Sequence, residues 1–333
     1  MEEIFSLDRV SVACVTDEGV KPVLIDINLH ISTGDWMMIV GRNGSGKSTL
    51  ARVLAGLCPL SRGTFSHKTT DANTPAVQII FQNPDAQIVG ETVYEDICFG
   101  LENKAVPSQD MPPLVYDAAK MVGLEDSLQR RVDELSGGQK QLLCIADALA
   151  MQATTLIFDE ATSMLDPLSQ QKILAIAKSL HQQGKTIIWV TQMMDELGYA
   201  NRVVALEAGR IIFDDTPTRF FYGEEQALPD VNTCTSLGFL SPYVVQIAQH
   251  LLQVGIVLPS KPMLAGELKE VIEADEDTIL VPGYIEPHTH PCQMYNPLTW
   301  GEALLKEGTV ASMNDNLTLL MLLEQQAQHY DRC

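Results

Sequence analysis

The fold of this chain is decided by the segment Gly41-Arg42-Asn43-Gly44-Ser45-Gly46-Lys47-Ser48-Thr49. The segment fits the pattern Gly-x-x-x-x-Gly-Lys-Ser/Thr, whose backbone N–H groups surround a bound phosphate. An apolar run at 36–40 precedes it and a helical pattern follows from about 47 to 55, so a buried strand is predicted to lead through a turn into a helix. The positive end of that helix faces the anion. Lys47 is then expected at the β- and γ-phosphates, and Ser48 at Mg²⁺.

A second segment, Thr155-Leu156-Ile157-Phe158-Asp159-Glu160, is an apolar strand that ends in two carboxylates. Mg²⁺ prefers hard oxygen ligands, so Asp159 is predicted to hold it, directly or through water. Glu160 comes one residue later, points elsewhere and is predicted to polarise the attacking water as a general base. Alone, such a pair is as often a solvated strand end, but the phosphate-binding segment favours the catalytic interpretation.

A third segment precedes a helix and has the sequence Leu135-Ser136-Gly137-Gly138-Gln139. A serine and two glycines at a helix N-terminus form a second anion site. Together the three segments resemble ATP-binding cassette proteins over about residues 3–272. The resemblance implies an α/β fold, the ABC-type P-loop NTPase domain, with a parallel-sheet core, an antiparallel β subdomain, a helical signature subdomain and a short C-terminal extension. It also implies ATP and Mg²⁺ as cofactors.

The resemblance assigns further residues to the nucleotide. Gly41 to Thr49 contact the chain's own ATP, while Ser136 to Gln139 serve ATP held by a partner subunit, so that two cassettes enclose two nucleotides head to tail. Gln82 matches the Q-loop glutamine, which contacts Mg²⁺ and water and senses the membrane partner. Asp166, in Ser163-Met164-Leu165-Asp166, matches the D-loop that crosses the dimer interface.

Within the cassette proteins, the chain resembles the ATPase subunits of energy-coupling factor transporters, closer to the first of their two types. The segments that carry this resemblance are Phe81 to Gly90, Glu91-Thr92-Val93, Phe99 to Asn103 and Asp159 to Pro167. The resemblance implies import of a vitamin or a transition-metal ion. It implies three partners: a second ABC ATPase subunit, identical or different, a transmembrane coupling protein and a substrate-binding membrane protein. The expected location is the cytoplasmic face of the cell membrane, as a peripheral protein.

Composition limits the other function classes. A formal charge of −21 over 333 residues disfavours nucleic acid as a partner, because affinity for its backbone comes from Lys and Arg. The acidity fits a basic protein partner or simply a soluble chain. Glu91, Glu95 and Asp96 are predicted to form an acidic rim for the coupling protein, or else a solvated helix face. No apolar run reaches the roughly 18 residues of a spanning helix. The seven cysteines include no Cys-x-x-Cys pair, which indicates a reducing compartment.

The remaining pattern alternates strands and helices, as in an α/β protein with a parallel sheet. An antiparallel sheet is expected from 4–12 and 23–31, and helical structure over 91–139, interrupted by the Pro-rich stretch 107–113. Further strands are expected at 77–81, 155–158, 185–190, 202–206 and 210–213, and further helices at 138–150, 168–182 and 193–200. The expected domains are an ABC ATPase domain at 1–222, a helical extension with two short helices at 223–272, and a segment of different composition at 273–333.

The chain departs from the cassette pattern at three positions. Cys14 stands where an aromatic residue usually stacks on adenine, so stacking is lost or Val12 and Val15 supply weaker apolar contact. Gln192 stands where the family usually has a His that contacts the γ-phosphate, and its amide donates a hydrogen bond without charge. Leu142 replaces a frequent Arg of the signature helix. Gln192 is therefore a predicted catalytic residue, with ATP binding retained and hydrolysis weakened or shared unequally with a partner ATPase.

The last 61 residues, 273–333, do not resemble a cassette. Val281 to Pro291 resembles the first barrel strand of metal-dependent amidohydrolases, particularly adenine deaminase-like proteins. His288 and His290 share a strand face there and could ligate one metal ion. A complete barrel needs about 200 residues or more, so a truncated fusion or a joint between two reading frames is favoured over an amidohydrolase domain. Three alternatives to a fully active transport ATPase stay open: a binding-dominant, weakly hydrolysing cassette subunit paired with an active ATPase, an amidohydrolase fusion and a non-transport cassette.

Overall fold

The structure, a computed structural model, describes residues 2–16, 19–68, 77–223, 232–253 and 258–274. The chain divides into two compact units, Met1–Ser241 and Pro242–Cys333. The predicted amidohydrolase-like strand, with His288 and His290, lies outside the described residues. Within the described ranges, no helix combines the length and apolar character needed to cross a membrane.

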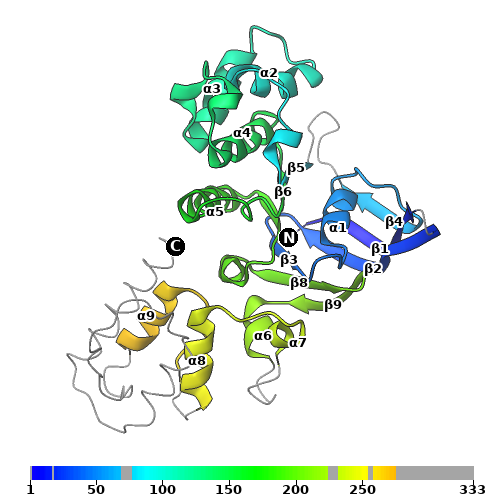
Figure 1. The fold of residues 1–333 in the computed structure, drawn as a ribbon, viewed down its shortest axis with the longest axis vertical. Coiled ribbons are helices and arrows are strands. Elements are labelled where there is room, and N and C mark those ends of the chain that lie inside the picture. The colour runs from blue at the N-terminus through cyan, green and yellow to red at the C-terminus, as the bar shows by residue number, and fades with distance from the viewer. Residues whose placement is uncertain (1, 17–18, 69–76, 224–231, 254–257, 275–333) are drawn as a thin grey trace. The chain divides into compact units, whose positions relative to one another are not determined.

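A six-stranded sheet forms the centre of the first unit (Figure 1). In spatial order its strands are β5 (Val77–Phe81), β6 (Thr155–Asp159), β7 (Thr186–Val190), β3 (Trp36–Val40), β8 (Arg202–Glu207) and β9 (Arg210–Asp215). The first five run parallel, and β9 pairs antiparallel with β8. Every residue of β3, β6 and β7 is buried, which explains their largely apolar sequences, because a central parallel strand is covered on both faces. The predicted α/β fold with a parallel core is confirmed.

The antiparallel β subdomain consists of three strands in the order β2 (Gly19–Ser32), β1 (Glu3–Thr16) and β4 (Arg62–His67). Alternation sets its inner face, since Leu29 and Ile31 are fully buried in the core while His30 between them is exposed. The helix α1 (Lys47–Leu54) adds buried side chains to the same core. The sequence analysis missed β4, because its mostly exposed residues carry no apolar alternation.

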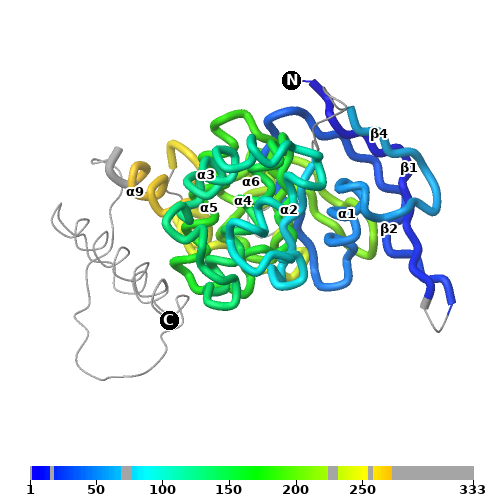
Figure 2. Tube along the Cα trace, turned by 90° about the horizontal axis from the view of Figure 1, so that it is seen from above, coloured from blue at the N-terminus to red at the C-terminus, as the bar shows by residue number. Residues whose placement is uncertain are grey.

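The helical subdomain is formed by α2 (Val93–Asn103), α3 (Met111–Val122) and α4 (Gly137–Ala150), which gather in one group in Figures 1 and 2. A capping box of Thr92 and Glu95 starts α2. The predicted interruption at 107–113 is shifted, because Pro112 and Pro113 lie in the first turn of α3, where proline is tolerated. Short 3-10 turns at Glu125–Ser127 and Val132–Glu134 connect α3 to α4.

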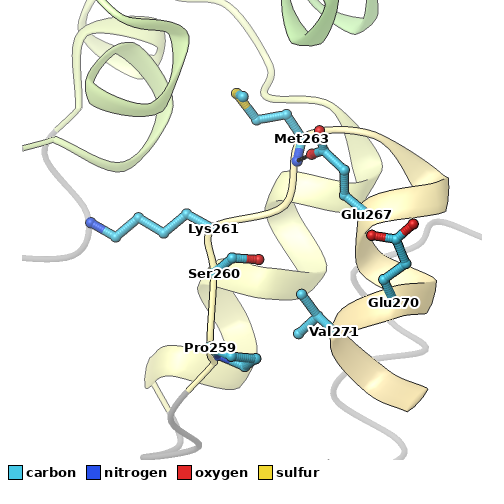
Figure 3. Close-up of a pocket in the computed structure, with 7 residues that line it drawn as sticks. All are labelled: Pro259, Ser260, Lys261, Met263, Glu267, Glu270 and Val271. Atoms are coloured by element: carbon cyan, nitrogen blue, oxygen red, sulfur yellow. Dashed lines mark hydrogen bonds between the residues drawn. The ribbon is translucent and has the colours of Figure 1, made fainter. Parts of the chain in front are cut away.

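The remaining helices flank the sheet or follow it. They are α5 (Pro167–Gln182), the 3-10 helix η4 (Met194–Tyr199), α6 (Pro217–Tyr222) and α7 (Thr233–Ser236). The second unit contains α8 (Tyr243–Gln253) and α9 (Ala265–Ala274), the two short helices that the sequence predicts. Glu267 in the first turn of α9 folds back so that its carboxylate accepts the backbone N–H of Met263 at 2.7 Å (Figure 3). This contact satisfies a backbone donor at the start of the helix.

A pair of acidic side chains is buried where α2 packs against α4. Asp96 is only 5% exposed, and its Oδ1 accepts the backbone N–H groups of Val89 and Gly90 at 2.7 and 2.8 Å. The prediction that it belongs to an exposed acidic rim is therefore wrong; Glu91 and Glu95 are exposed. The Asp147 carboxyl of α4 interacts with Asp96, and Asp96 Oδ2 and Asp147 Oδ1 are both buried without another hydrogen-bond partner among the described residues, which fits a proton shared between the two carboxyl groups. Burial, followed by the charge of Asp96, raises the pKa of Asp147 well above its usual range.

The raised pKa means that the folded chain keeps a proton on Asp147 that the unfolded chain releases. Asp147 therefore lowers the free energy of unfolding increasingly as the pH rises above the ordinary Asp pKa of about 4. We expect Asp147→Asn, whose amide donates the same hydrogen bond, to raise the Tm at pH 8 by roughly 3 °C or more. The gain should shrink as the pH approaches 4. Thermal unfolding from pH 5 to 8 measures it, with exposed Asp117→Asn as the control; an equal Tm shift at every pH would contradict the shared proton.

Candidate functional site

The phosphate-binding segment folds into a tight loop between β3 and α1, and two of its glycines are sterically required. Gly41 has φ of +150°, and a Cβ there would lie 2.4 Å from the carbonyl oxygen of Leu206. Gly46 has φ of +105°, and a Cβ there would lie 2.7 Å from Leu24 Cδ2. Neither backbone position admits a side chain without movement of a neighbour. The sequence pattern thus marks real steric constraints as well as a phosphate site.

The polar groups of this loop are arranged in two layers. Arg42, Asn43 and Gly44 are exposed, whereas Ser45 and the residues that follow turn inward. The buried Oγ of Ser45 has no hydrogen-bond partner among the described residues, and a buried polar atom normally has one. Such an unsatisfied hydroxyl beside a ring of backbone N–H groups fits a phosphate ligand. Ser48 and Thr49 are half-buried at the start of α1.

Lys47 points back across the mouth of the loop. Its Nζ lies 2.9 Å from the carbonyl oxygen of Gly41 and 3.4 Å from Glu160 Oε1, and its side chain is only 4% exposed. A buried ammonium group that contacts one carboxylate oxygen and backbone carbonyls is held ready for a further anion. The sequence predicts this cation at the phosphates, and the structure brings it next to the predicted general base.

Ser48 and Asp159 meet at the carboxyl ends of β3 and β6. The Ser48 hydroxyl donates to Asp159 Oδ1 at 2.8 Å. Burial raises the pKa of Asp159, while the Ser48 hydroxyl lowers it. An alcohol oxygen beside a half-desolvated carboxylate is a hard oxygen donor set, which fits Mg²⁺ with retained water ligands. These two predicted metal ligands are therefore adjacent.

Glu160 and Gln192 are hydrogen-bonded to each other. Glu160 has φ of +52°, a left-handed conformation that is uncommon outside glycine and that directs its side chain away from Asp159. Gln192 Nε2 donates to Glu160 Oε1 at 2.8 Å and to Asn43 Oδ1 at 2.8 Å. The two amide hydrogens thus connect the predicted base to the phosphate-binding loop. Gln192 Nε2 and Lys47 Nζ both contact the same carboxylate oxygen, Glu160 Oε1.

Gln82 is connected to the same cluster through Ser163. Its Nε2 donates to Ser163 Oγ at 3.1 Å, and that hydroxyl donates to the Glu160 carbonyl oxygen at 2.9 Å. The chain beside Gln82 is attached to the signature helix, because Lys140 Nζ lies 2.6 Å from Asp85 Oδ1 and Gln141 donates to the Phe81 carbonyl at 2.9 Å. The sequence analysis missed these contacts, for which no motif exists.

The signature residues form a separate cluster at the start of α4. Ser136 and Gln139 make a capping box, with backbone-to-side-chain distances of 3.3 and 3.0 Å. Asp166 caps α5 by accepting from Ser169 N at 3.0 Å and Ser169 Oγ at 2.6 Å. A Cβ on Gly138 would lie 2.4 Å from Ser169 Oγ, so the signature segment and the D-loop segment are neighbours. Within the described residues, no hydrogen bond joins the side chains of Ser136, Gln139 or Asp166 to Lys47 or Glu160.

The predicted adenine-side contacts are only partly available. Cys14 is exposed, and so is Val15, with 85% of its surface accessible. Val12 is 2% exposed and packs in the core, so the prediction that it supplies apolar contact to adenine is wrong. The physical reason is strand alternation, which turns every second side chain of β1 inward.

A further buried carboxylate, Glu196, lies behind the cluster and is absent from every motif. It is 3% exposed and accepts from Thr162 Oγ1 at 2.7 Å and Trp189 Nε1 at 2.8 Å. Its position in η4, after β7, gives no sequence signal, because acidic side chains are common on exposed turns. Elsewhere in the described chain, no group of three or more His, Cys, Asp and Glu side chains could hold a metal ion.

Comparisons with known proteins agree with this geometry. Residues 24–163 match the family model described as "ABC transporter". The energy-coupling factor transporter ATP-binding protein EcfA1 of Levilactobacillus brevis is 38% identical over 277 residues, which cover 81% of this chain and 96% of that protein. EcfA1 of Halalkalibacterium halodurans is 37% identical over 270 residues, which cover 79% of this chain and 95% of that protein.

Solved structures show the same fold. For cbiO1 from Clostridium perfringens, described as part of the ABC transporter complex cbiONQ, the TM-score is 0.59 at 29% identity, covering 66% of this chain and 91% of that chain. For the ATP-binding cassette MJ0796, in a dimeric post-hydrolysis state bound to ADP and Pi, the TM-score is 0.58 at 25% identity, covering 64% and 99%. The phosphate loop, the acidic strand end and these matches together show that the chain belongs to the family of energy-coupling factor transporter ATP-binding proteins, a branch of the ABC ATPases.

Proposed function

We propose that this chain is the ATP-binding and hydrolysing subunit of an energy-coupling factor transporter, coupling ATP binding and hydrolysis to import of a vitamin or metal ion. One observation carries the proposal: Lys47, Glu160 and Gln192 converge on the mouth of the phosphate-binding loop, with contacts of 2.8 to 3.4 Å. The arrangement offers a cation for phosphate, a carboxylate for water and an amide that fixes the carboxylate. These are the parts that phosphoryl transfer to water needs.

Each group then has a definite task. Backbone N–H groups of the loop and Lys47 bind the phosphates of ATP. Glu160 orients and polarises the attacking water, and Gln192 keeps that carboxylate aimed. Mg²⁺, held by Ser48 and Asp159 with Gln82 nearby, would neutralise charge on the phosphates when bound. The self-contained cluster around Ser136 and Asp166 is the part that a second cassette's ATP would contact.

The proposed partners follow from this division of the site. A second ABC ATPase subunit completes each nucleotide site, and a transmembrane coupling protein contacts the surface beside Gln82, together with a substrate-binding membrane protein. The chain is then peripheral, at the cytoplasmic face of the cell membrane. We assign residues 1–222 to the ATPase domain and 223–272 to its helical extension.

A second candidate function is a binding-dominant subunit, whose nucleotide holds the dimer closed while the partner ATPase does most of the hydrolysis. The observation that favours it is the neutral amide of Gln192 at the position that contacts Glu160. A neutral donor forms a weaker hydrogen bond to a carboxylate than a charged one does. The exposed Cys14, which offers no aromatic ring to adenine, weakens nucleotide contact as well.

The substitution Glu160→Gln tests the general base. Glu160→Gln keeps the shape of the side chain but removes the group that polarises water, so ATP hydrolysis should fall by about 100-fold or more while ATP affinity stays within about threefold. Phosphate release and binding of a fluorescent ATP analogue measure the two quantities. Glu207→Gln, at an exposed carboxylate of β8, is the matched control. Retained hydrolysis in Glu160→Gln would remove this residue from the catalytic role.

The second prediction separates the two candidate functions. An imidazolium at position 192 would make a charge-assisted hydrogen bond, so Gln192→His should raise the hydrolysis rate of the chain about tenfold if the neutral amide limits turnover. Rates are measured for the chain alone and with a second energy-coupling ATPase, with Gln183→His on the surface as the control. Brisk turnover by the unaltered chain alone, with no gain from Gln192→His, would instead establish a fully active transport ATPase.

A further inference from the structure

Glu196 is a buried carboxylate without a cation in contact with it among the described residues. It is 3% exposed, and the ion pairs of the described chain do not include it. The Thr162 hydroxyl donates to it at 2.7 Å and the Trp189 indole N–H at 2.8 Å, and the Thr191 hydroxyl lies beside it as a third donor group. Removing a carboxylate from water costs free energy that neutral hydrogen bonds only partly return. A position that keeps such a group calls for a reason other than stability.

The three donors lie in the two segments of chain that carry Glu160 and Gln192. Thr162 stands two residues after Glu160, and Thr191 stands immediately before Gln192. Trp189 lies in β7, and its ring stacks on Phe158 of β6 with centroids 4.6 Å apart. The carboxylate therefore bridges the loop that carries the general base and the strand end that carries its amide partner.

The hydrogen-bond directions around Glu196 are consistent with one another. The Thr191 hydroxyl accepts the backbone N–H of Met193 at 2.9 Å, so its proton is available for Glu196. An indole N–H can only donate. An ionised carboxylate accepts all these bonds at once.

Thr162 extends the bridge to the D-loop. Its carbonyl oxygen accepts from Leu165 N at 3.1 Å and from Gln170 Nε2 at 3.1 Å. Its hydroxyl donates its one hydrogen to Glu196, and the residue is 2% exposed. A shift of Thr162 would therefore move both the backbone of Glu160 and the segment leading to Asp166.

We propose that Glu196 is a positioning residue for ATP hydrolysis, which fixes the separation of Glu160 and Gln192 by holding Thr162 and Trp189 on one carboxylate, with Thr191 beside them. The inference rests on the proposed hydrolytic function and adds a residue that touches no substrate. The side chains of Glu160 and Gln192 make a single 2.8 Å contact, and the backbone N–H of Glu160 bonds to the Val190 carbonyl at 3.0 Å. Glu196 adds a side-chain link between the loop after β6 and strand β7. Misplacement of a catalytic group by about 1 Å costs up to about 100-fold in rate.

Thr162 offers a matched pair of variants for the test. Thr162→Val keeps the shape and removes the hydroxyl, and Thr162→Ser keeps the hydroxyl. We expect Thr162→Val to lower kcat by at least about tenfold with the KM for ATP within about twofold, and Thr162→Ser to retain kcat within about twofold. Glu196→Gln provides an independent second variant with the same expected loss, and Asp195→Asn, its exposed neighbour, is the control. All are measured as the full chain with radiolabelled ATP, below the Tm of each variant.

The outcomes are distinguishable. Unchanged kcat in a folded Thr162→Val or Glu196→Gln protein overturns the positioning role while the proposed function stands. A parallel loss of kcat and ATP affinity, or an equal loss in Thr162→Ser, assigns Glu196 to folding and overturns the proposal too. Absence of hydrolysis by the unaltered chain, even with a partner ATPase, overturns the proposed function and this inference together.

Discussion

Parallel pairing of β3, β6 and β7 is the constraint on which the rest of the molecule depends. The register places Ile39 opposite Val190 and Val190 opposite Asp159, so the carboxyl ends of all three strands meet at one edge of the sheet. The phosphate-binding loop directly follows β3, Glu160 directly follows β6, and Gln192 is the second residue after β7. Asn43 of the phosphate-binding loop and Gln192 are more than a hundred residues apart in sequence, so no local interaction could bring them together. Binding sites in open parallel sheets form at this edge for the same reason.

This edge holds the buried charged side chains of Lys47, Asp159 and Glu196. Lys47 and Glu160 offset each other, and Asp159 is supported by a hydroxyl, but Glu196 is held by neutral donors alone. The wholly buried strands on either side supply the apolar packing that offsets such costs. The helical subdomain repeats the pattern with Asp96 and Asp147, where a proton rather than a cation relieves the repulsion. Buried polar groups in this chain thus mark places where segments must keep a fixed relation.

The sequence was sufficient for the fold, while the roles of the site residues in contiguous motifs stay predictions. The predicted strands at 36–40 and 77–81 agree with the structure in every residue, and the first is a run of buried apolar side chains, which leaves little ambiguity. It was insufficient for β4, whose residues are mostly exposed, and for the orientation of Val12 and Asp96, which depends on alternation and helix phase. Glu196 could not be found, because its role comes from three donors contributed by two loops and a strand.

The polar groups of the site fall into two clusters. Lys47, Glu160 and Gln192 are bonded to one another, whereas Ser136 and Asp166 satisfy only their own helices. The capping box at Ser136 uses the side chains of Ser136 and Gln139 locally, so this helix end is satisfied by its own residues. The two clusters are connected through the segment around Gln82. Lys140 and Gln141 of α4 bond to that segment, and the Gln82 amide contacts Ser163, close in sequence to Glu160. A force on the segment around Gln82 therefore acts on both anion sites, which is the property a nucleotide-driven transport subunit requires.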